Sequence, residues 1–100
     1  MDKNLVPEVK TINWKGEGDY AVVNNNFEKL LLNKSVKLVL ELINGINTID
    51  DINNILINEY KDTDEPHYIE EIVEESIQLL IDNNIINMKE DEIDGWLQYE

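Results

Sequence analysis

The sequence contains no cysteine, a single histidine, only two prolines and no long apolar run. Without cysteine, the chain has no disulfide framework, no thiolate nucleophile and no cysteine ligands for zinc or an iron–sulfur cluster. This composition suits a reducing cytosol. No segment approaches the roughly 18 apolar residues of a membrane-spanning helix, and the first residues lack the apolar run of a signal peptide. We therefore expect a cytoplasmic protein.

The residue patterns of catalytic and metal-binding sites are also absent from the sequence. His67 follows Pro66 at a predicted helix start and has no partner at ligand spacing. The acidic stretch 62–65 lacks the glycine and the closing glutamate of a calcium-binding loop. The chain also has no glycine-rich phosphate loop, nucleophile elbow or histidine-based triad. The sequence therefore predicts a protein that is not an enzyme and that needs no cofactor or metal.

Negative charge dominates the composition. Asp and Glu number 22 against 8 Lys and Arg, which gives a net charge of −14. Such a surface repels phosphate backbones and anionic lipids, so we expect neither nucleic acid nor a membrane as a partner. The length of 100 residues fits one domain with one hydrophobic core.

Three stretches show the alternation that is typical of β-strands. Val6–Trp14 alternates loosely, with Pro7 near its start, where an edge strand tolerates proline. Residues 15–18 contain two glycines and predict a turn. Tyr20–Val23 and Glu28–Leu32 then read as a hairpin whose turn is rich in asparagine.

The last of these strands has an apolar residue on each face. Leu30 and Leu32 share one face, while Lys29 and Leu31 share the other. Leu31 is therefore predicted to point away from the core. Single exposed hydrophobic residues are common, so Leu31 and its neighbour Phe27 either contact a partner or pack under the N-terminal strand or the C-terminal tail.

Three helices are predicted, over residues 35–43, 48–60 and 67–83. Asn33 or Ser35 caps the first helix, and Asn44-Gly45 ends it as a left-handed cap. Thr48 begins the second helix with an acid three residues later, which is a capping-box pattern.

The third helix has a wider apolar face than one helix pair needs. The centre of that face is formed by Ile69, Val73, Ser76 and Leu80, and one flank carries Tyr68, Ile72 and Leu79. The flank is either plain core or the wall of a binding groove. After the helix, Ile85-Ile86 returns as a short strand or closes the core. The tail 89–100 is acidic but contains apolar and aromatic residues, so it either stays unfolded or docks on a surface.

The order of these elements resembles the PqqD-like family, which comprises winged-helix-like recognition domains for ribosomally synthesised, post-translationally modified peptides. The similarity spans 20–57 and 68–86. The matching features are a strand running into Leu32-Asn33, Asn44-Gly45 where the family usually has Asp-Gly, the helix start 48–52, and the helix end 79–86. The acidic tail is not part of the family pattern.

The resemblance implies an α+β, winged-helix-like fold over residues 1–88, in which a three-stranded antiparallel sheet packs on three helices. It also implies a non-catalytic adaptor, to which the leader of a precursor peptide adds as a fourth strand. A separate maturation enzyme, such as a radical iron–sulfur enzyme or a leader peptidase, would then modify the peptide. The implied peptide-binding residues are Phe27, Glu28, Lys29, Leu30, Leu31, Leu32, Tyr68, Ile72 and Leu79.

Two other functional classes fit the same pattern of elements. A winged-helix transcriptional regulator has a similar fold, but the net charge opposes DNA binding. A structural module of a larger complex would bind its neighbour and ignore a short leader peptide.

Overall fold

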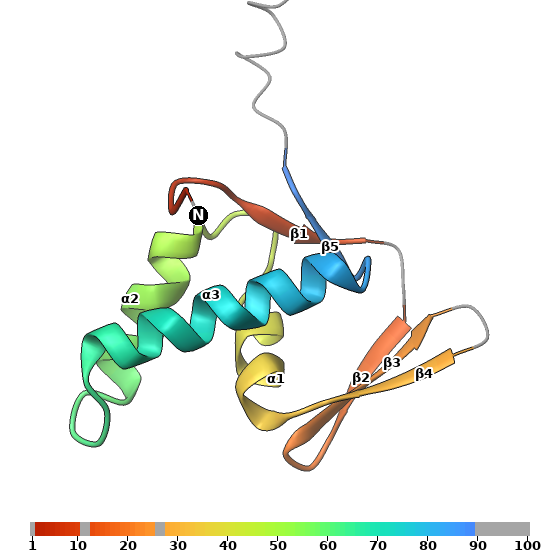
Figure 1. The fold of residues 1–100 in the computed structure, drawn as a ribbon, viewed down its shortest axis with the longest axis horizontal. Coiled ribbons are helices and arrows are strands. Elements are labelled where there is room, and N and C mark those ends of the chain that lie inside the picture. The colour runs from red at the N-terminus through yellow and green to blue at the C-terminus, as the bar shows by residue number, and fades with distance from the viewer. Residues whose placement is uncertain (1, 11–12, 26–27, 90–100) are drawn as a thin grey trace, which may run out of the picture.

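A computed structural model of the chain describes residues 2–10, 13–25 and 28–89. These residues form three helices, a three-stranded antiparallel sheet and a separate two-stranded sheet (Figure 1). The elements are β1 (Pro7–Val9), β2 (Asn13–Glu17), β3 (Tyr20–Asn25), β4 (Glu28–Leu32), α1 (Lys34–Glu41), α2 (Ile49–Glu59), α3 (Pro66–Asp82) and β5 (Ile86–Met88). The predicted α+β fold with three helices and a three-stranded antiparallel sheet is confirmed.

The N-terminal region differs from the prediction of one strand followed by a turn at 15–18. The structure has two strands there, and β1 pairs with β5 while β2 pairs with β3. Glu17 pairs with Tyr20, which leaves only Gly18-Asp19 as the turn. Gly18 has a φ of 60°, and a positive φ at the first central residue suits a tight hairpin turn that follows the strand twist. Two residues therefore suffice to reverse the chain.

Gly16 lies in β2, where it pairs with Ala21, and the side chain of Lys37 passes close to it. A Cβ added to Gly16 would lie 2.9 Å from Cε of Lys37. The Nζ of Lys37 donates a hydrogen bond of 2.6 Å to the carbonyl of Gly18 and lies 3.7 Å from a carboxylate oxygen of Glu41. The lysine thus ties α1 to the β2–β3 hairpin.

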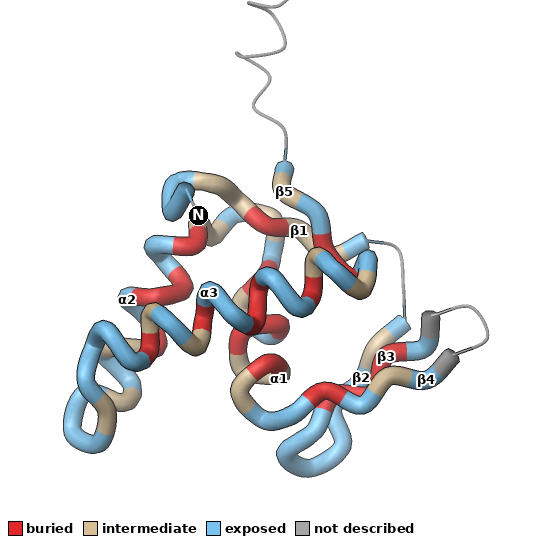
Figure 2. Tube along the Cα trace, in the orientation of Figure 1, coloured by how far each residue is buried: buried red, intermediate tan, exposed pale blue. Residues whose placement is uncertain are grey.

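The hydrophobic core lies between the inner face of this sheet and the helices, where Figure 2 shows the buried residues in red. α3 packs on α1 and α2, and α1 packs on β3. The fully or nearly fully buried apolar residues include Ala21, Val23, Val39, Leu40, Ile52, Val73, Ile77, Leu80, Ile85 and Ile86. The core therefore joins all three helices to both sheets.

The start of α2 is held by its own cap and by the N-terminal segment. Thr48 accepts a hydrogen bond from the Asp51 N–H, and the Asp51 carboxylate accepts one from the Thr48 N–H, so the predicted capping box is confirmed. The N–H groups of Ile49 and Asp50 donate to the carbonyls of Leu5 and Lys3. These four bonds satisfy donors that a helix start otherwise leaves unpaired.

The end of α1 falls earlier than predicted. Its C-cap is Leu42, so Asn44-Gly45 is not the helix cap, and that prediction was wrong. The Asn44 side chain accepts hydrogen bonds from the N–H groups of Ile46 and Asn47 and so turns the chain itself, while Gly45 takes a φ of 77° in the α1–α2 loop. At the other end, Asn33 is the N-cap, because its side chain accepts from the Val36 N–H.

α3 ends in a Schellman motif that leads directly into β5. The N–H of Asn84 donates to the carbonyl of Ile81, and the N–H of Ile85 donates to that of Leu80. Asn84 has a φ of 59°, and both Leu80 and Ile85 are fully buried. Ile86 then begins β5 and pairs with Val9, and both Ile85 and Ile86 are buried in the core, so both of the outcomes expected for this pair occur.

This left-handed residue gives a stability prediction. Replacing Asn84 by alanine should destabilise the fold by about 1 kcal/mol, because alanine tolerates a positive φ less well than asparagine. Asn84→Gly is the matched variant and should be neutral or slightly stabilising, since glycine adopts this conformation freely. Asn84 is exposed, so neither change alters core packing. Urea unfolding of the two variants measures the difference, and equal midpoints would contradict the assignment.

Candidate functional site

β4 has one open edge. It is an outer strand of the sheet ordered β2-β3-β4, and its inner edge pairs with β3 through Ala21–Leu32, Val22–Leu31 and Val23–Leu30. Along the other edge, no strand of the described residues pairs with it. An edge of this kind carries backbone donors and acceptors that an extended peptide can use.

The register indicates which residues point their backbone groups outward. In an antiparallel ladder, alternate residues bond to opposite sides. The tight turn at Gly18-Asp19 makes Glu17 and Tyr20 a hydrogen-bonded pair, so Tyr20, Val22 and Asn24 face β2. The intervening residues of β3 then bond to Leu30 and Leu32. We infer that the N–H and C=O groups of Lys29 and Leu31 point toward the open edge.

The side chains of β4 divide as the alternation predicted. Leu32 is buried in the core and Leu30 is half-buried against it. Leu31 is 66% exposed and lies on the opposite face of the sheet, beside the exposed Lys29. The prediction that Leu31 points away from the core is confirmed.

The outer face of the sheet continues from β4 onto its neighbours. Val22 pairs with Leu31, and Lys15 pairs with Val22, so these three side chains lie in one row across the strands. Tyr20 lies on the same face and is 50% exposed. Val22 is itself buried, so among the described residues of this face the exposed apolar side chains are Leu31 and Tyr20, with the exposed Lys15 and Lys29 on the same face.

The predicted flank of α3 lies partly in a pocket. Tyr68 is half-exposed, Ile72 is half-buried, and both line a hollow of about 260 Å³ between α1, α2 and α3. Its lining residues are Lys34, Ser35, Leu38, Leu56, Tyr60, Asp64, Tyr68, Ile69 and Ile72. Leu79 is 39% exposed and does not line this pocket. The structure thus brings two of the three predicted flank residues together.

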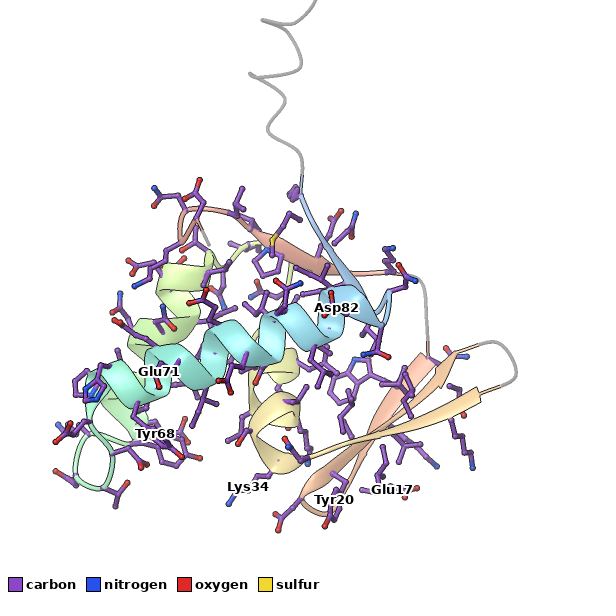
Figure 3. All side chains as sticks on the ribbon, viewed as in Figure 1. Glu17, Tyr20, Lys34, Tyr68, Glu71 and Asp82 are labelled. Atoms are coloured by element: carbon purple, nitrogen blue, oxygen red, sulfur yellow. The ribbon has the colours of Figure 1, made fainter. Side chains whose placement is uncertain are left out.

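The pocket adjoins the end of β4. Leu32 ends the strand, Asn33 caps α1, and Lys34 begins α1 on the wall of the pocket. Figure 3 shows Lys34 and Tyr68 on the same side of α3. The wall of the pocket therefore begins in the first turn of the helix that follows β4, and none of the lining residues belongs to β4 itself.

Sequence reasoning missed several residues of this pocket. Lys34 and Ser35 of α1, and Tyr60 at the end of α2, line it beside Tyr68. Each stands at a helix end, where a sequence pattern shows a cap but does not show which other helix lies opposite. The breadth of the apolar face of α3 was the one signal of an extra surface.

Several predicted residues lie outside the described structure. Phe27 and the tail beyond Lys89 are among them, so their predicted contacts stay predictions. His67 is described, and its Nδ1 lies 3.3 Å from a carboxylate oxygen of Glu65 at an exposed helix start.

In residues 2–10, 13–25 and 28–89, no group of three or more histidine, cysteine, aspartate or glutamate side chains is placed to hold a metal ion. Within the same ranges, no helix has both the length and the apolar character to cross a bilayer.

Comparison of the chain with protein-family models, with curated proteins and with solved structures gave no match.

Proposed function

We propose that this protein is a non-catalytic adaptor that captures the leader of a precursor peptide by strand addition along β4. The observation that carries the proposal is the open edge of β4, where Lys29 and Leu31 direct backbone groups outward. The pocket of Tyr68 and Ile72 begins at Lys34, in the helix that follows this strand. Main-chain hydrogen bonds along such an edge fix a peptide with little demand on its sequence. The pocket then adds selectivity for a side chain.

The adaptor acts by raising effective concentration. A peptide held on β4 stays near any enzyme that binds the same protein, so the reaction between them becomes effectively intramolecular. The enzyme is a separate protein, of the radical iron–sulfur or leader-peptidase class, and supplies all of the chemistry. Both partners belong to the cytoplasm in this proposal, which the absence of cysteine favours.

Amide exchange tests this proposal directly. The probes are synthetic peptides that cover the first twenty or so residues of each short open reading frame encoded beside this gene. A bound leader should slow exchange at Lys29 and Leu31, where a fourth strand forms hydrogen bonds, and in α3 around Tyr68 and Ile72. Exchange across α2 should change little, apart from its end near the pocket.

Two results would contradict strand addition. Protection centred on α2 would mean that binding uses a helical face. Binding of the neighbouring enzyme without binding of any such peptide would support a structural module instead. The net charge of −14 predicts that duplex DNA does not bind at low or moderate salt, and a salt-sensitive DNA complex would favour the regulator.

A further inference from the structure

The side chains of β4 alternate between the two faces of the sheet, and those of any strand that adds to its edge must alternate in the same way. Side chains of the added strand that lie beside Lys29 and Leu31 share the outer face of the sheet, and those beside Leu30 and Leu32 share the inner face. Directly neighbouring side chains on one face of a sheet interact, and opposite charges or paired apolar groups are favourable. The sequence of β4 therefore constrains the sequence of its partner.

Lys29 is the cationic residue of β4. It is exposed, and none of the ion pairs found among the described side chains includes it. By contrast, Lys15 on the same face lies 3.3 Å from Glu17, and Lys37 lies near Glu41. In a protein with 22 acidic residues, Lys29 is thus a cation available to a partner on the outer face.

The inner side of the edge has the opposite character. Leu30 and Leu32 are apolar there and pack in or against the hydrophobic core. An acid on the inner face of a bound peptide would therefore lie beside apolar side chains, where a charge is unfavourable.

We propose that the captured peptide carries an acidic residue beside Lys29 and an apolar residue beside Leu31, with apolar residues at the inward positions. In an antiparallel strand, which is the more stable pairing, the acid stands two residues after the outward apolar residue. This inference rests on the proposed strand addition and specifies the peptide that it selects.

The test is a pair of selections from a displayed library of random 12-residue peptides, one against the full-length protein and one against Lys29→Glu. Wild-type protein should enrich an acid two residues after an outward apolar residue by about twofold to fivefold, as expected for a cross-strand charge pair on a surface. An acid at the adjacent inward positions should be depleted. The Lys29→Glu variant should reverse the outward preference to lysine or arginine.

The outcomes separate this inference from the function on which it rests. The fold of Lys29→Glu is checked by circular dichroism, and no change is expected because Lys29 is exposed. One outcome is that the enriched peptides protect Lys29 and Leu31 from amide exchange and yet show the same charge preference with both proteins. That result would overturn the pairing of an acid with Lys29 but would leave strand addition intact. If the enriched peptides protect no residue of β4, strand addition itself fails.

Discussion

Substituting proline for Leu31 is expected to weaken peptide binding at β4 while the domain stays folded. The N–H of Leu31 points to the open edge, so proline removes a donor that only a bound peptide uses. Leu31 is also 66% exposed, so its replacement leaves the core intact. The peptide carbonyl left unpaired costs about 1–3 kcal/mol, which weakens binding by about fivefold to more than a hundredfold. A fluorescence anisotropy titration with a bound leader peptide measures this loss.

Two variants control for the proline. Leu31→Thr keeps the N–H and removes most of the apolar side chain, so it should bind the peptide with a smaller loss than the proline variant. Leu30→Pro removes a donor that faces Val23 within the sheet, and it should lower the urea midpoint where Leu31→Pro does not. Unchanged peptide affinity in Leu31→Pro would show that β4 is not the docking edge.

Local patterns predicted several local features of this fold correctly, although the expected helix cap at Asn44-Gly45 was wrong. The capping box at Thr48 and the N-cap at Asn33 could be predicted because a cap involves residues only three apart in the sequence. The exposure of Leu31 followed from the alternation of five residues. In each case the interacting groups are close in sequence, so the pattern contained the whole interaction.

Contacts between distant segments were the ones that the sequence did not show. β1 pairs with β5, almost eighty residues away, and nothing in either short segment specifies the other. Gly16 read as a turn residue, although its lack of a side chain makes room for Lys37 from α1. Because the tight turn begins at Gly18, β2 extends to Glu17, into the stretch 15–18 that was predicted to be a turn.

The candidate site shows the same division. Its strand edge was predictable because the order of β2, β3 and β4 follows from two successive hairpins. The pocket was not predictable, because it depends on how α1, α2 and α3 pack against one another. Tyr68 and Ile72 line it, whereas Leu79, which lies on the same flank by helical spacing, falls beyond it.

Removal of residues 1–10 is expected to destabilise the domain by about 3–5 kcal/mol, enough to unfold much of a marginally stable protein. The deletion takes away β1, the pairing partner of β5, and uncovers Ile85 and Ile86, which are buried in the full chain. It also removes the carbonyls of Leu5 and Lys3, so the first two N–H groups of α2 lose their acceptors. Urea unfolding followed by circular dichroism measures the change.

Deletion of residues 90–100 is the matched control, because it removes a segment of similar length from the other end. Every contact described for the fold remains, including the hydrogen bond from the Lys89 N–H to the carbonyl of Val6. The shortened chain should therefore keep its urea midpoint within about 0.5 kcal/mol of the full chain. Peptide affinity then shows what the tail does: tighter binding means that it competes for β4, and unchanged affinity with weaker enzyme binding means that it contacts the enzyme. A C-terminal deletion that unfolds the protein as the N-terminal one does would make the tail part of the core.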